Sequence, residues 1–117
     1  MLRALMKILN QRNNQVIDQV HLRSGITGLM FRKPSRALLT FSREVLGSMA
    51  SVWTPFMRFS LDLVFVNAKG VVNDIKYDLV PWKIYVPCGS SKYVIEVEAG
   101  LIRDMDFEIG DKLIFEN

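Results

Sequence analysis

The alternation of apolar and polar positions is clearest in two runs, LDLVFV at 61–66 and VVNDIKYDLV at 71–80. Successive side chains of an extended chain point to opposite faces, so alternate positions of the second run form an apolar face and a polar face. The residues between the runs, NAKG, suit a tight turn, because Gly70 can adopt a positive φ. The pattern therefore predicts a β-hairpin.

Shorter apolar runs continue along the chain, separated by glycine, proline and polar residues. We expect strands at 16–22, 37–41, 82–86, 93–99 and, after a turn, within 107–116. The run 37–41 also fits the start of a helix, but the glycine and serines that follow favour a strand. The run 82–86 lies between Pro81 and Pro87, which limits it to an edge strand or an extended connection.

Helices are expected to be few and short. The segment 24–36 contains two glycines and a proline and predicts a turn or a single helical turn, and a second short turn or helix is expected at 101–105. The fold class that follows is mainly β, or α+β at most: a compact small barrel or sandwich of short strands with one or two short helices.

The composition is that of one folded domain over residues 1–117, since half of the residues are hydrophobic and 23% are charged. Cys88 is the only cysteine, which excludes an internal disulfide framework and a cysteine-based zinc site. Lys7 interrupts the apolar N-terminal stretch, no small-residue cleavage site follows, and no apolar run is long enough to span a bilayer. We expect a cytoplasmic protein with no membrane association, resident cofactor or bound metal.

Charge is distributed unevenly along the sequence. Residues 1–36 carry seven basic residues and one acidic residue, whereas residues 95–117 carry seven acidic residues and two basic residues. This asymmetry fits either a basic arm that binds nucleic acid or two oppositely charged ends that pack together. We favour the second interpretation, because the basic residues are dispersed and have no aromatic residues clustered among them.

Charged residues inside apolar runs mark the candidate site. Arg58 and Asp62 lie in WTPFMRFSLDLVFV at 53–66, and Glu96 lies in the apolar run 93–99. A buried ionised group costs several kcal/mol unless it is paired or solvated. On a regular strand Arg58 and Asp62 would share a face about 13 Å apart, so we expect each to reach a residue on a neighbouring strand or a ligand.

A set of short motifs resembles a known family. They are GLMFR at 28–32, ALLTF at 37–41, the pattern T-x-x-MRF-x-[IL]-D at 54–62, Pro-Trp at 81–82, VIEVEAG at 94–100 and I-G-D at 109–111. In this order and spacing they resemble the domain of unknown function 192 family over about residues 16–115, with residues 1–13 as an N-terminal extension. Many relatives carry histidine and proline where this chain has Trp53 and Ser60. The resemblance implies a compact, mostly β domain and no assigned activity.

Three functions remain open at this stage. The first is a binding module for a polar small molecule, a glycan or a protein partner, with no catalytic residue. Its candidate binding residues are Trp53, Thr54, Met57, Arg58, Asp62, Trp82 and Glu96. The second is a carboxylate-dependent hydrolase with Asp62 and Glu96 in one cleft. The third is a structural protein whose function lies in a homo-oligomer or another partner surface.

Overall fold

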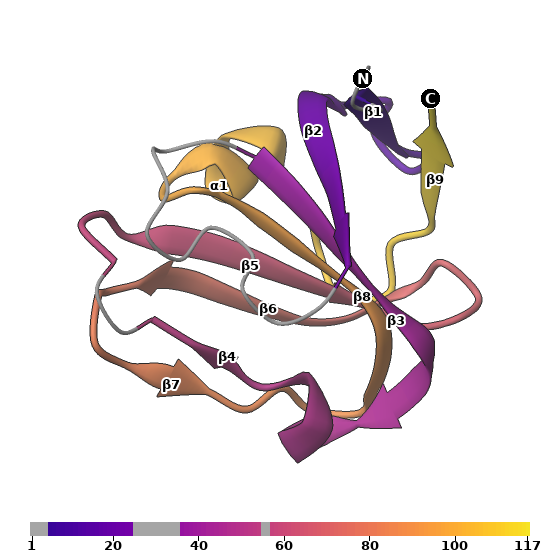
Figure 1. Ribbon diagram of the computed structural model, residues 1–117. Helices are drawn as coiled ribbons and strands as arrows, with labels where there is room; N and C mark the ends of the chain where they lie inside the picture. The colour runs from indigo at the N-terminus through magenta and orange to yellow at the C-terminus, as the bar shows by residue number, and fades with distance from the viewer. Residues whose placement is uncertain (1–4, 25–35, 55–56) are drawn as a thin grey trace.

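The computed structural model describes residues 5–24, 36–54 and 57–117 (Figure 1). Its elements are β1 (Leu5–Asn10), β2 (Val16–Ser24), β3 (Arg36–Leu46), the 3₁₀ turn η1 (Gly47–Ala50), β4 (Val52–Trp53), β5 (Leu61–Val66), β6 (Val72–Leu79), β7 (Ile84–Tyr85), β8 (Ser90–Glu98), α1 (Leu101–Met105) and β9 (Leu113–Glu116). The prediction of a mainly β fold with short helices is confirmed. The segment 25–35, expected to be a turn, lies outside the described residues.

Seven strands form one curled sheet in the order β6-β5-β8-β3-β2-β1-β9 (Figure 1). Neighbouring strands are antiparallel except β2 and β3, which are parallel. The hairpin predicted for 61–80 is confirmed as β5 and β6. The N-terminal run forms β1, between β2 and β9, a strand that the sequence analysis did not assign.

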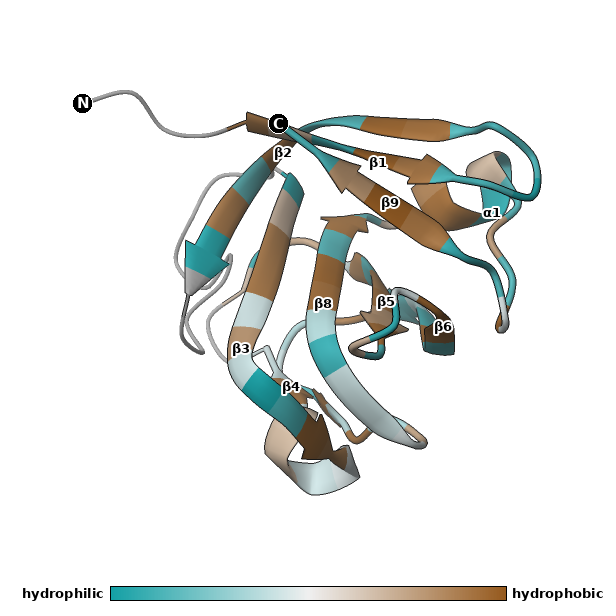
Figure 2. Ribbon diagram, turned by 90° about the vertical axis from the view of Figure 1, so that its right-hand side faces the viewer, coloured by the Kyte–Doolittle hydropathy of each residue, from teal (hydrophilic) through white to brown (hydrophobic). Residues whose placement is uncertain are grey.

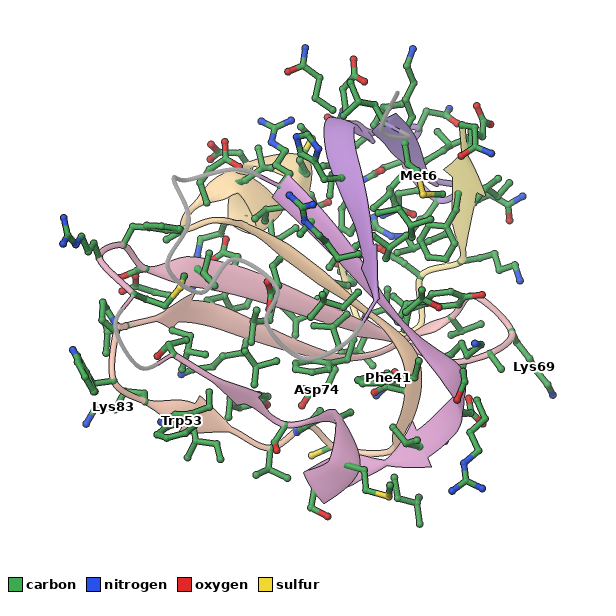
Figure 3. All side chains as sticks on the ribbon, viewed as in Figure 1. Met6, Phe41, Trp53, Lys69, Asp74 and Lys83 are labelled. Carbon is green, nitrogen blue, oxygen red and sulfur yellow. The ribbon has the colours of Figure 1, made fainter. Side chains whose placement is uncertain are left out.

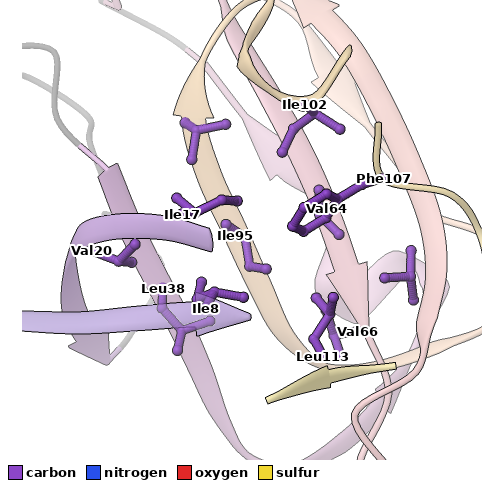
Figure 4. Packing of buried hydrophobic residues seen from close by; sticks show 12 residues of the cluster. Ile8, Ile17, Val20, Leu38, Val64, Val66, Ile95, Ile102, Phe107 and Leu113 are labelled. Carbon is purple, nitrogen blue, oxygen red and sulfur yellow. The ribbon is translucent and has the colours of Figure 1, made fainter. Parts of the chain in front are cut away.

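The face of the large sheet that packs against α1 carries the first apolar cluster (Figure 4). Val64 of β5, Ile95 of β8 and Ile8 of β1 contribute to it, together with Ile102 of α1 and Phe107. Figure 2 shows the apolar residues of β1 and β9 near α1 at this end of the molecule. This cluster joins the two ends of the chain to the central strands.

The opposite face of the sheet is covered by the two-stranded sheet β4–β7 (Figure 1). Leu63 and Phe65 of β5 pack there with Val94 of β8, Val52 of β4 and the partly buried Tyr85 of β7. Because β5 is covered on both faces, all six of its residues are buried. A continuous apolar run such as LDLVFV is typical of a strand in this position.

The oppositely charged ends of the chain pack together. Arg12 Nε donates to Asp111 Oδ1 at 2.7 Å, and Asn10 Nδ2 donates to Asp111 Oδ2 at 2.7 Å. Arg36 Nε lies 3.0 Å from a carboxylate oxygen of Glu98. Arg12 and Arg36, two of the basic residues of 1–36, are thus paired with acidic residues of 95–117. In the described ranges no helix is long and apolar enough to cross a bilayer.

Candidate functional site

Asp62 is buried in β5, and main-chain groups satisfy its carboxylate. Its Oδ1 accepts a hydrogen bond from the Asp78 N–H at 2.9 Å, while Oδ2 accepts from Gly100 N–H at 2.9 Å and Ile102 N–H at 3.1 Å. Gly100 is the N-cap residue of α1 and has no side chain with which to cap the helix. Asp62 takes that role from a neighbouring strand, and so it ties β5 to both β6 and α1.

Glu96 is also buried, but on the other face of the sheet. In the register of β5 and β8, Asp62 lies opposite Val97, and Leu63 lies opposite Glu96. Cross-strand partners share a face, and successive residues alternate. Val97 packs in the cluster beside α1 and Leu63 in the cluster beneath β4–β7. The hydrolase hypothesis required both carboxylates in one cleft, and as an acid–base pair it is therefore wrong.

Arg58 lies outside β5, which begins at Leu61. Its side chain is exposed, whereas Met57 beside it is buried in the cluster beneath β4–β7. The expectation that Arg58 and Asp62 share a strand face is therefore wrong. The reason is local: the chain bends at Phe59 and pairs with the sheet only from Leu61, so the alternation of β5 cannot be continued back to Arg58.

Thr54 fixes the turn that carries Trp82. The buried Thr54 hydroxyl accepts a hydrogen bond from Lys83 N–H at 2.9 Å and donates to the Val80 carbonyl at 2.9 Å. The main chain adds two more bonds, from Thr54 N–H to the Lys83 carbonyl at 2.8 Å and from Trp82 N–H to the Thr54 carbonyl at 2.7 Å. This arrangement clamps the residues 80–83 against the end of β4.

Trp82 has a left-handed backbone with φ of 64°. Such a conformation costs a non-glycine residue roughly 1–3 kcal/mol and persists where the surroundings hold it in place. The hydrogen bonds of Thr54 supply that support. Nevertheless the Trp82 side chain is 59% exposed, so the strained backbone presents an indole ring at the surface instead of burying it.

Trp53 stands on the outer side of β4, with Ile84 of β7 directly opposite. The two side chains share one face and are 61% and 62% exposed. The adjacent pair, Val52 and Tyr85, faces inward onto the large sheet. Figure 3 shows Trp53 near Lys83 at the edge of the molecule. The small sheet is thus apolar on its inner side and on its outer side.

Exposed apolar side chains concentrate around this small sheet. Of the eleven large hydrophobic side chains that are exposed in the described part of the chain, seven lie within 46–53 and 80–86. We call these seven the aromatic surface: Leu46, Met49, Trp53, Val80, Trp82, Ile84 and Val86. The two segments are in close contact at Gly47. A Cβ at this position would lie only 2.9 Å from the Pro87 carbonyl oxygen and 3.7 Å from Val86, so the absence of a side chain lets the segments approach each other.

A buried carboxylate anchors the aromatic surface from below. Asp74 Oδ2 accepts hydrogen bonds from the Tyr85 hydroxyl at 2.6 Å and the Cys88 N–H at 2.9 Å (Figure 3). Burial, together with the hydrogen bond to Asp74, raises the pKa of Tyr85 to about 12. The Tyr85 ring also packs against Phe65, with 5.7 Å between the ring centres. These contacts fix β7 to β6 and to the large sheet.

The structure brings some of the predicted site residues together and separates others. Trp53, Thr54 and Trp82 meet at β4 and the clamped turn, whereas Asp62 and Glu96 lie on opposite faces of the large sheet. Sequence reasoning missed Ile84 and its exposed partners. The apolar residues at the alternate positions 82, 84 and 86 could have indicated a shared face, because side chains two residues apart on a strand point the same way. Within the described ranges, no three His, Cys, Asp or Glu side chains gather to hold a metal.

The sequence model of domain of unknown function 192 (DUF192), described as an uncharacterized ACR family, matches residues 14–115. The chain belongs to this family. Thr54 and Asp62, which the resemblance had singled out, are the residues that clamp the turn and cap α1. In this DUF192 domain two motif residues therefore maintain the fold.

Relatives and structural neighbours agree with this assignment. A UPF0127 protein of Pyrococcus furiosus is 40% identical over 86 residues, covering 74% of this chain and 73% of the relative. A UPF0127 protein of Pyrococcus horikoshii is 37% identical, covering 74% of each chain. A crystal structure of a protein of unknown function from Novosphingobium aromaticivorans has a TM-score of 0.81 at 20% identity, over 96% of this chain and 84% of that one.

A second crystal structure, from Sinorhizobium meliloti, has a TM-score of 0.78 at 22% identity, over 98% of this chain and 96% of that one. Its description suggests a transcription regulator. At these identities the two crystal structures show that the DUF192 domain shares their fold.

Proposed function

We propose that this DUF192 domain is a binding module that docks a protein partner on the aromatic surface. The observation that carries the proposal is the pairing of Trp53 and Ile84, both about 60% exposed, on the outer side of a sheet whose inner side is anchored. A contiguous apolar patch on a monomer marks an interaction site, and tryptophan is enriched among the residues that dominate interface energetics.

The polar groups favour a protein over a glycan or a polar small molecule. Ligands of those kinds need several polar side chains to orient them beside the aromatic rings. The Thr54 hydroxyl is engaged by the main chain, and Asp62 is buried on the opposite side of the sheet. The rings instead have aliphatic neighbours such as Ile84 and Val86, as expected where a partner contributes apolar side chains of its own.

A nucleic-acid partner receives little support from this surface. The segments 46–60 and 80–89 contain two basic residues, Arg58 and Lys83, whereas phosphate-backbone binding draws on many. We therefore do not propose transcription regulation for this chain.

We also propose a cytoplasmic location. The exposed free thiol of Cys88 is compatible with a reducing compartment.

The two tryptophans are the only ones in the sequence, so intrinsic fluorescence reports directly on this surface. Peptides would be selected from a random dodecapeptide display library on the immobilised domain and then titrated in solution. The proposal predicts a blue shift of tryptophan emission on binding, because a docked partner removes water from both rings. It also predicts about 30-fold weaker binding for Trp53→Ala.

A matched pair of variants provides the control. Ile84 and Ile109 are similarly exposed, at 62% and 64%, but Ile109 lies in the turn before β9. We expect Ile84→Asp to weaken binding at least about tenfold, and Ile109→Asp to leave it unchanged. If no selected peptide shifts the emission, or if both variants bind equally well, the proposal fails.

A further inference from the structure

Lys83 is the one charged residue in the two segments that carry the aromatic surface. Residues 46–54 and 80–87 contain no other basic residue and no aspartate or glutamate. The Lys83 side chain is exposed and forms no ion pair within the described part of the chain. Lys83 lies between Trp82 and Ile84 in the sequence and near Trp53 in space (Figure 3).

This charge pattern disfavours a second copy of the chain as the occupant. A two-fold interface places the same patch of both copies face to face. The segments that carry this patch contain no acidic side chain that could pair with Lys83 of the other copy. An apolar surface whose one charged residue is basic is better suited to a partner of opposite charge.

The pattern also disfavours an anionic membrane. Lipid-binding patches on proteins carry clusters of four to eight basic residues, each adding about 1 kcal/mol of attraction. The segments that carry this surface contain one basic residue, Lys83. In addition, Trp82 is held on a turn clamped by Thr54, and Trp53 lies in the strand that ends beside that clamp. A rigid aromatic platform suits a partner with a defined shape.

We propose that the partner is an acidic polypeptide segment that docks its large apolar side chains onto Trp53 and Ile84 and directs aspartate or glutamate toward Lys83. This inference rests on the proposed function and names the chemistry of its partner. The apolar anchors provide most of the affinity, and the carboxylates at the border provide selectivity and a faster association rate.

The test uses the peptides that the display experiment selects. Aspartate and glutamate should be enriched among them, and replacing those residues by asparagine and glutamine should weaken binding about three- to tenfold. The loss should be larger at about 0.02 M than at about 0.3 M NaCl, because the Debye length shortens as salt is added. Lys83→Glu should reverse the preference, so that peptides carrying lysine at the same positions bind better than the acidic originals.

Lys69→Glu is the matched control, because Lys69 is an exposed lysine in the β5–β6 turn, on the other side of the molecule from Lys83 (Figure 3). It should leave the preference for acidic peptides unchanged. Peptides that bind without acidic enrichment or salt dependence would overturn this inference and leave the proposed function standing. Binding to phosphatidylserine vesicles without any peptide binding, or a concentration-dependent dimer in sedimentation, would overturn both.

Discussion

Replacing Asp62 by alanine should destabilise the domain by about 3–5 kcal/mol. The carboxylate accepts hydrogen bonds from three main-chain N–H groups, of Asp78, Gly100 and Ile102. A hydrogen bond to a charged group contributes roughly 1.5–3 kcal/mol, and the three bonds to one carboxylate are not fully additive. Part of the lost free energy of unfolding is recovered if the start of α1 frays, because its N–H groups then form hydrogen bonds with water.

The assay is urea denaturation followed by far-ultraviolet circular dichroism, for the wild type, Asp62→Ala and Asp62→Asn. We expect asparagine to recover up to about half of the loss, because it retains one acceptor oxygen and adds a donor that faces other donors. Asp104→Ala is the control: Asp104 is exposed in the first turn of α1 and should cost less than about 1 kcal/mol.

Amide hydrogen exchange measures the same bonds directly. Asp62→Ala should lower the protection of the Gly100 and Ile102 amides more than that of the central strands. The assignment of Asp62 as the cap of α1 would be refuted if Asp62→Ala cost less than about 1 kcal/mol and both amides kept their protection.

Three further changes test other parts of the fold. Thr54→Val removes the side-chain bonds that clamp the turn and should cost about 1–2 kcal/mol in urea denaturation, whereas Thr54→Ser should cost less. The raised pKa of Tyr85 stabilises the fold below pH 10, and this contribution is lost as pH rises toward about 12, so a stability profile over that range should be flatter for Tyr85→Phe. Burial alone would raise the pKa of Asp111, but hydrogen bonds, with Arg12 foremost, lower it below its ordinary 3.8. Its contribution should therefore be present above about pH 4 and be lost as pH falls through the folded pKa, and Asp111→Asn should remove that part of the acid sensitivity in denaturation at pH ~2–5.

Much of the fold could be predicted because strand alternation is a local property. The hairpin at 61–80 follows from two apolar runs and a turn with Gly70, and the two faces of β8 follow from period-two alternation. The N-terminal strand β1 was missed, because its run resembles other apolar termini and its partners include β9, more than 90 residues away.

The candidate site depended on information that alternation does not contain. Whether Asp62 and Glu96 share a face is decided by the register of β5 against β8, strands that are separated by β6 and β7 in the sequence. The partners of Asp62 are main-chain groups 16 to 40 residues away, and any residue could provide them. Trp53 and Trp82 could be identified as candidates, because large rings beside prolines stand out in any sequence.

The place of β1 in the sheet affects how the chain can fold during synthesis. β1 lies between β2 and β9, and Asn10 and Arg12 meet Asp111 about a hundred residues later. On the ribosome these residues emerge well before β9 and must wait for that strand before this side of β1 can pair. We therefore expect the final closure of the sheet to wait until β9 has emerged, with folding on the millisecond-to-second scale typical of non-local β topologies.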